Sequence, residues 1–130
     1  MPISPICRDP EMLCPCVHRL HTEMVDMATA REICPVTIET IRELDRQQHY
    51  VGLGVSWTLK SYHLAQPPHD LSLAFDLAPQ EYLSHPLWNP DGEKWDQLGD
   101  LGQLIGLEWG FQLWRKDKPH FQLTMCECTR

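Results

Sequence analysis

Histidines and aspartates gather in one proline-containing segment and one later motif of this 130-residue chain. The segment KSYHLAQPPHDLSLAFDL contains His63, His69 and Asp76, and the motif DKPHFQL contains Asp117 and His120. Two imidazoles and one carboxylate leave a fourth position open, as a catalytic zinc site requires. Zinc lowers the pKa of water in that position toward about 7, which makes a nucleophile near neutral pH. We therefore predict Zn²⁺ ligation by His63, Asp76 and His120, with Asp117 placed to take and return a proton.

Two short strands are needed to bring His63 and Asp76 together. The stretches SWTLKSYHL (56–64) and LSLAFDLAP (71–79) both read as strands, joined by a Pro-Pro-His-Asp connection. HFQLTMCEC (120–128) reads as the closing strand and begins at His120. On spacing alone, a histidine and an aspartate across a turn are more often surface residues than ligands.

The other segments predict helices and one further strand. A helix over 17–32 has an apolar face made of Val17, Leu20, Met24, Met27 and Ala28. A strand over 33–41, a shorter helix over 43–53 and a tight turn at 90–92 follow. A last helix over 93–106 should turn inward Trp95, Leu98, Leu101, Leu104 and Ile105. This order predicts an α+β fold, with a small antiparallel sheet and two or three helices, in a single domain over 1–130.

Composition and charge exclude several classes of partner. The chain is 42% hydrophobic and 22% charged, with a net charge of −7. Its Lys and Arg residues are scattered, which argues against nucleic acid, because phosphate binding needs a basic patch. Prolines and charges at the start predict cytoplasmic synthesis without a signal peptide. No run approaches the roughly 20 apolar residues of a membrane span, so we expect no membrane insertion.

The cysteines allow three interpretations. Cys14 and Cys16 form C-P-C, Cys126 and Cys128 form C-E-C, and the two others stand apart. The C-x-C spacing is poor for structural zinc, and disulfides are disfavoured without a secretory signal. We favour mostly reduced, partly buried thiols. A disulfide joining the two ends of the chain and a second metal site are the alternatives.

Two other histidine groups have simpler interpretations. His18 and His21 lie three apart on the first helix and could pair on a metal, but no third ligand is evident near them. His49 and His85 read as surface or substrate-side histidines.

The order of motifs resembles a family of zinc peptidases that act on bacterial cell-wall peptides. That family includes D-alanyl-D-alanine carboxypeptidases, L-alanyl-D-glutamate endopeptidases and many phage endolysins. Its pattern is S-x-H-x-x-G-x-A-x-D, then a helix ending in G-L-x-W-G, then D or E-x-x-H. SYH, SLAFDL, IGLEWGF and DKPHFQL occur here in that order, and TIRELDRQ is similar to the family's arginine-containing segment. The resemblance spans residues 36–123.

The resemblance implies a role for each matching residue. His63, Asp76 and His120 would bind zinc, and Asp117 would be the general base, with Glu108 as the runner-up. Arg42 would stabilise the oxyanion that develops at the scissile carbonyl. Ser61 and Gln47 would support substrate binding.

Spacing departs from the family pattern at the first histidine. Family members usually have seven residue steps from this histidine to the aspartate. Here His63 to Asp76 is thirteen steps and His69 to Asp76 is seven. We favour His63 and a loop lengthened by six residues, because a hairpin tip tolerates insertion and two prolines precede His69. The family's usual glycine is replaced by Ser72, and His69 stays the alternative ligand.

Three functions follow, the first of which we favour. It is a zinc-dependent peptidase that hydrolyses an amide bond of the peptidoglycan stem peptide, of L-Ala–D-Glu endopeptidase or D-Ala–D-Ala carboxypeptidase type. Such a chain is expected to be a monomer of phage or prophage type that acts on the cell wall after release. The alternatives are a non-catalytic metal- or peptide-binding relative, and a cysteine-rich metal or redox protein.

Overall fold

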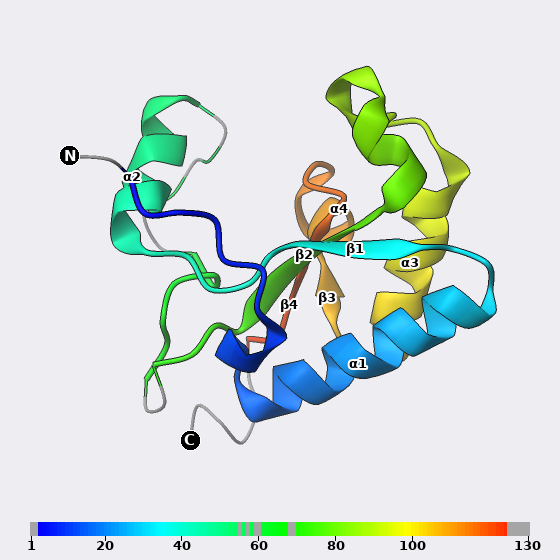
Figure 1. Ribbon diagram of the computed structural model, residues 1–130, viewed down its shortest axis with the longest axis horizontal. Helices are drawn as coiled ribbons and strands as arrows, with labels where there is room; N and C mark the ends of the chain where they lie inside the picture. Colours follow the sequence, from blue (N-terminus) through cyan, green and yellow to red (C-terminus); the bar gives the residue numbers. More distant parts are fainter. Residues whose placement is uncertain (1–2, 55, 57, 59–60, 68–69, 125–130) are drawn as a thin grey trace.

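The computed structural model describes residues 3–54, 56, 58, 61–67 and 70–124 (Figure 1). The helices are η1 (Pro10–Met12), α1 (Pro15–Ala30), α2 (Leu44–Gly52), η2 (Gln80–Ser84), η3 (Pro86–Trp88), α3 (Glu93–Leu104) and α4 (Gly110–Trp114), where η marks a 3-10 helix. The strands are β1 (Pro35–Glu39), β2 (Ala74–Pro79), β3 (Glu108–Trp109) and β4 (His120–Gln122). None of these helices is both long enough and apolar enough to cross a membrane.

The four strands form one antiparallel sheet in the order β1-β2-β4-β3. Side chains alternate between its two faces, as the period of two in a strand requires. Phe75, Leu77 and Phe121 are fully buried on one face, where they join the main hydrophobic core. The intervening positions Asp76 and His120 therefore lie on the opposite face.

Two helices supply most of the remaining core. α1 contributes Val17, Leu20, Met24 and Ala28, and α3 contributes Leu98 and Leu101. α1 packs against α3 and β1, α3 also packs against β2, and α2 lies on the opposite side of the molecule from α3 in Figure 1. Both core helices thus leave the face with Asp76 and His120 open for a site.

Gly106 follows α3 and is the first residue of the G-L-x-W-G motif. Gly106 has a φ of 102°, a left-handed conformation that glycine adopts without strain. The amide of Leu107 then donates to Gly102 O at 2.9 Å, which closes a Schellman cap. This cap turns the chain back into β3, which pairs with β4.

The α+β class with a small antiparallel sheet is confirmed, but some elements differ from the sequence predictions. Within 56–64, residues 61–64 form a turn and bend instead of a strand, and β2 pairs with β1 and β4. Leu104 was predicted to face inward and is 72% exposed, because α3 ends there. The short elements β3 and α4 were not predicted, since two and five residues show no clear period.

The thiol prediction holds for only part of the chain. Cys7 and Cys34 carry thiols, but Cys16 takes part in a disulfide. Cys16 is thus an exception to the mostly reduced thiols expected from the sequence. Cys126 and Cys128 lie outside the described residues.

Candidate active site

The sheet itself places two of the predicted ligands side by side. Asp76 of β2 is paired in register with His120 of β4, and on its other side with Glu39 of β1. Directly opposite residues of an antiparallel pair share a face, with Cβ atoms about 5 Å apart. Backbone pairing alone therefore aligns a row of Glu39, Asp76 and His120 on the face without core helices.

His63 reaches this row from a turn. Its backbone amide donates to Ser61 Oγ at 3.1 Å, and its carbonyl accepts from Arg42 N at 2.8 Å. Its ring Nδ1 lies 2.7 Å from Thr40 O, and the residue is 1% exposed. The turn is therefore held by bonds to the segment after β1, and no strand is needed to present His63.

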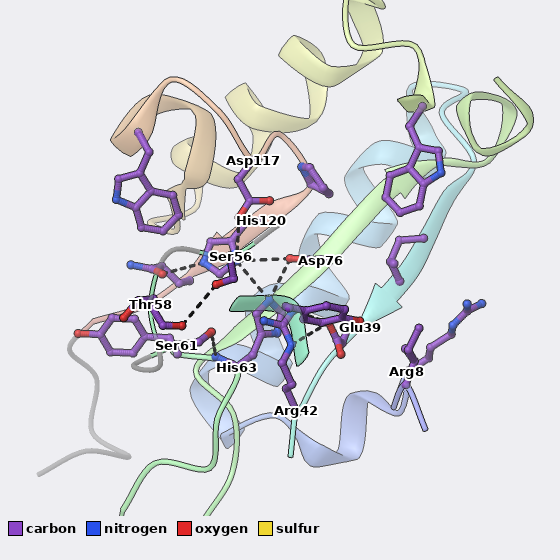
Figure 2. Close-up of a pocket in the computed structure, with 18 of the residues that line it drawn as sticks. Arg8, Glu39, Arg42, Ser56, Thr58, Ser61, His63, Asp76, Asp117 and His120 are labelled. Carbon is purple, nitrogen blue, oxygen red and sulfur yellow. Dashed lines mark hydrogen bonds and ion pairs between the residues drawn. The ribbon is translucent and has the colours of Figure 1, made fainter. Parts of the chain in front are cut away.

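One potential ligand atom from each of the three residues lies close to the other two (Figure 2). His63 Nε2 lies 3.0 Å from Asp76 Oδ1 and 3.2 Å from His120 Nδ1, which lies 3.4 Å from Asp76 Oδ1. We call these three residues the His–Asp–His cluster, whose ligand atoms all lie within 4.8 Å of one another. The cluster could hold a metal ion.

Hydrogen bonds set the tautomer of both rings. Thr40 O can only accept, so His63 Nδ1 carries a proton and leaves Nε2 with its lone pair. His120 Nε2 lies 2.7 Å from Gln122 Oε1, and the Nε2 of that amide donates to Glu108 at 3.4 Å. His120 Nδ1 is thereby left with its lone pair. Two lone pairs and a carboxylate oxygen at this distance repel one another unless a cation lies among them, so the donor set fits a metal ion.

Asp76 and His120 shift each other's pKa values. When protons in place of a metal ion lie between these atoms, burial disfavours the ionised form of Asp76, but the charges and hydrogen bonds of His63 and His120 outweigh it and lower the pKa of Asp76 far below its usual value. Burial likewise opposes a charge on His120, yet the hydrogen bond and charge of Asp76 raise the pKa of this histidine. An anionic Asp76 that attracts a cation is the common element of both shifts.

Asp117 lies at the edge of the cluster, in the turn that leads into β4. Its Oδ2 is 3.9 Å from His120 Nδ1, and its carbonyl accepts from His120 N at 3.2 Å. Burial, reinforced by the charge of Asp76, raises the pKa of Asp117 to about 6. The turn that contains Asp117 packs closely against Gly110, because a Cβ at this glycine would lie only 2.5 Å from Asp117 O. The glycine that closes the G-L-x-W-G motif thus allows the close approach that positions Asp117.

Arg42 is fixed on the other side of the cluster by three partners. Its Nε donates to Glu39 Oε1 at 3.1 Å, with a second, shorter contact from Nη2, and its Nη1 donates to Gln47 Oε1 at 2.6 Å. The guanidinium carbon lies 4.7 Å from the ring centre of Tyr50. Among the residues that the structure describes, one N–H on each terminal nitrogen has no acceptor, and the side chain lines the pocket.

Comparisons with known proteins agree with this geometry. A family model described as D-alanyl-D-alanine carboxypeptidase matches residues 56–123, which is more than half of the chain. The chain belongs to the D-alanyl-D-alanine carboxypeptidase family. The resemblance seen in the sequence motifs is therefore confirmed, and membership places the chain among the peptidases. Arg42 and Gln47 precede the matched range.

A solved structure supports the same fold. The crystal structure described as Serratia marcescens L-Ala D-Glu endopeptidase ChiX is similar to this chain, with a TM-score of 0.64. The two are 24% identical, and the match covers 88% of this chain and 83% of that chain. At this identity the similarity shows the fold alone. No curated protein matches the chain.

Other predicted residues of this family member occupy different places. Ser61 lines the pocket and accepts the bond from the His63 amide. Gln47 is fully buried and donates to Ser56 Oγ and Thr58 O, so it contacts Arg42 instead of open space. Glu108, the alternative base, bonds the Gln122 amide behind His120. His69, the alternative ligand, lies outside the described residues.

The remaining histidines lie apart from the cluster. His21 bonds Thr37 Oγ1 at 2.8 Å and packs edge-on against Phe75, so it belongs to the core side of the sheet. His49 is exposed on α2, whereas His85 lines the pocket.

Three residues of the site were missed by sequence reasoning. Glu39 holds Arg42, and Thr40 and Gln122 hold the two histidine rings. Gln122 could have been found, since residues two apart on a strand share a face. Thr40 acts through its backbone carbonyl, so its residue type carries no signal.

Proposed function

We propose that this chain is a zinc-dependent peptidase that hydrolyses an amide bond of the peptidoglycan stem peptide. The bond is of the L-Ala–D-Glu endopeptidase or D-Ala–D-Ala carboxypeptidase type. His63, Asp76 and His120 hold the metal through Nε2, Oδ1 and Nδ1. The observation that carries the proposal is the convergence of two tautomer-fixed nitrogens and one carboxylate oxygen, beside a second carboxylate, in a chain of this peptidase family.

The metal and its surroundings have separate tasks. When bound, zinc supplies Lewis acidity, which activates water and polarises a carbonyl group. Thr40 O and Gln122 Oε1 fix the tautomer and the orientation in which both imidazoles would act as ligands. Hydrogen bonds that orient the ligand side chains occur at structural as well as catalytic metal sites. The argument for catalysis therefore depends on Asp117 and Arg42.

Asp117 moves the proton in this proposal. Its carboxylate accepts a proton from the attacking water and returns it to the amine that leaves. The side chain is 33% exposed and lies at the edge of the cluster, where both water and substrate reach it. A structural zinc site would have no use for this carboxylate, which is evidence against a non-catalytic relative.

Arg42 stabilises negative charge on the substrate. Glu39, Gln47 and Tyr50 hold the guanidinium before any substrate arrives, so little reorganisation is needed during reaction. Its two remaining N–H groups are the donors for the oxygen of the scissile carbonyl. Gln47 then acts as a positioning residue that contributes to substrate binding through Arg42.

Metal content tests the ligand set. Elemental analysis should find about one zinc per wild-type chain, lost in His63→Ala and in His120→Ala. His69→Ala and the exposed His49→Ala are matched controls and should keep the metal. Loss of zinc in His69→Ala with retention in His63→Ala would move the ligand into the longer loop. Zinc retained in all four variants, or never bound, would contradict the proposal.

Cleavage of defined peptidoglycan fragments tests the reaction. Mass spectrometry of the products identifies the bond that is cut. Asp117→Asn should keep zinc while kcat falls by about 10²- to 10⁴-fold, because it removes the proton acceptor. Unchanged kcat in this variant would exclude Asp117 as the base and direct attention to Glu108.

The setting of the enzyme is part of the proposal. Its substrate lies outside the cytoplasm, and we propose that the protein is a monomer that reaches the wall by release from the producing cell, as a phage endolysin does. The protein is added in parallel to intact cells and to isolated cell walls. If it acts only after release, the isolated walls should be digested and the intact cells should not.

A further inference from the structure

Residues 4–9 form an N-terminal strap beside the segment that follows β1 and the start of α2. Ser4 donates to Asp45 Oδ2 from both N and Oγ at 2.9 Å. Thr40 N donates to Cys7 O at 2.8 Å, and Asp9 caps η1 by accepting from Glu11 N at 2.9 Å. The strap is thus tied at its start, middle and end, and its middle anchor is the residue that orients His63.

The strap supplies one wall of the pocket around the His–Asp–His cluster. This pocket has a volume of about 1020 Å³ and is lined by Ile6 and Arg8 of the strap as well as by the cluster. Figure 2 shows Arg8 on one side of the cluster and Thr58 and Ser61 on the other. A peptide with its scissile carbonyl at the cluster therefore extends toward Arg8 in one direction.

Arg8 is available to a ligand. Its side chain is exposed, and it has no hydrogen bond or ion pair with the part of the chain that the structure describes. Glu39, which lies between Arg8 and the cluster in Figure 2, already pairs with Arg42 and lies 3.7 Å from Arg46. Arg42 and Arg46 therefore neutralise the carboxylate of Glu39, which does not compete with a ligand for Arg8.

Charge is distributed unevenly over the molecule. The chain carries −7 overall, yet Arg8 and Arg42 both line this side of the pocket, and the nearby carboxylate of Glu39 is already shared by Arg42 and Arg46. Ile6 and Ile38 line the same pocket, and apolar neighbours strengthen the attraction between an arginine and an anion. A wall of this kind favours an anionic group on the ligand.

We propose that Arg8 is a specificity-determining residue that binds a carboxylate of the substrate peptide, away from the bond that is cut. The guanidinium fork matches a carboxylate with two parallel hydrogen bonds. The inference rests on the proposed function, because a stem peptide carries such carboxylates. They come from two sources, the free carboxyl of its glutamate residue and the carboxyl at its C-terminus.

The experiment compares matched acid and amide substrates on the zinc-loaded full chain. Two pairs of synthetic stem peptides differ only in whether the glutamate carboxyl, or the C-terminal carboxyl, is free or amidated. For one pair, Arg8→Gln should lower kcat/KM of the acid by about ten- to a hundredfold, mainly through KM, and leave the amide unchanged. Arg8→Lys should restore part of the loss. Arg31→Gln, the same charge change at the end of α1, is the control.

The outcomes separate the two hypotheses. The pair that loses its acid preference identifies the carboxylate that Arg8 binds. Equal losses on acid and amide, or no loss on either acid, would overturn the role of Arg8 while the peptidase proposal stands. If the wild-type protein cleaves none of the four peptides, the proposed function fails and the role of Arg8 fails with it.

Discussion

The two sides of the candidate site are built by different means. Asp76 and His120 lie on adjacent strands and are aligned by backbone pairing. His63 and Arg42 lie on segments without helix or strand, joined to each other by one backbone hydrogen bond and to the sheet through Thr40 and Glu39. We call Asp76 and His120 the sheet side of the site, and His63 and Arg42 its loop side.

Strand pairing holds its ligands more firmly than the individual polar bonds of the loop side do. The sheet side is backed by Phe75 and Phe121, which stack with ring centres 5.8 Å apart in the core. The loop side depends on individual polar bonds, each of which contributes about 1 kcal/mol. A site that combines them keeps two ligands fixed while the third can adjust to metal and substrate. The predictions below test that difference, from the largest expected effect to the smallest.

Hydrogen exchange should separate the two sides most strongly. Amides in the β2–β4 pairing should exchange at least about 1000-fold more slowly than those of Leu64 and Gln66, because core strands open only with the whole fold. The measurement is native-state exchange on the metal-free protein. Added zinc should then slow exchange at Leu64 and Gln66, since His63 becomes a ligand. Equal protection on both sides would contradict the distinction.

Acid should weaken the sheet side through His21. Burial lowers its pKa to about 4, with a further contribution from His18, against 6.5 for an ordinary histidine. The folded state therefore binds fewer protons than the unfolded state, so stability is full above pH 6.5 and falls as the pH drops toward 4. The complete loss is about 3 kcal/mol, at 1.36 kcal/mol for each unit of pKa.

A non-titrating variant measures this contribution. The free energy of unfolding should fall by about 3 kcal/mol more in the wild type than in His21→Asn between pH 7 and 4. Urea unfolding at both pH values gives the difference. His49→Asn, on the exposed face of α2, should behave like the wild type. Identical losses in the wild type and His21→Asn would exclude His21 as the cause.

The sheet side was also the more predictable from sequence. The stretches LSLAFDLAP and HFQLTMCEC were correctly read as containing the strands that carry Asp76 and His120, because strand periodicity is a local property. His63 was found through its S-x-H motif, although the strand expected around it is a turn. That turn is fixed by bonds to Thr40 and Arg42, about twenty residues earlier, which no local pattern reveals.

Gln122 gives the next prediction. Gln122→Met removes the acceptor for His120 Nε2 and should weaken zinc binding by about ten- to a hundredfold. Competition with a metal chelator measures the dissociation constant. The corresponding acceptor on the loop side is the backbone carbonyl of Thr40, which no substitution removes. Gln103→Met, an exposed position on α3, is the control, and equal affinities in both variants would show that Gln122 does not orient the ring.

Ser72 gives the smallest effect and tests the loop side directly. This fully buried serine stands where the family usually has glycine, and its hydroxyl lies 2.6 Å from Ala74 O and 3.2 Å from Tyr62 O, beside His63. Ser72→Ala should lower the free energy of unfolding by about 1 kcal/mol. Ser72→Gly should cost about a further 0.5–1 kcal/mol, because glycine loses more backbone freedom on folding.

Urea unfolding of the two variants is compared with Ser84→Ala, whose hydroxyl makes an exposed bond to Glu81 O at 3.2 Å. Ser84→Ala should change stability by less than about 0.5 kcal/mol. Zinc content should stay unchanged in all three, because Ser72 bonds the neighbouring backbone and not the ligand atoms of the cluster. If Ser72→Gly were as stable as the wild type, the serine would be an incidental replacement, and the bonds of His63 to Thr40, Arg42 and Ser61 would hold the turn without it.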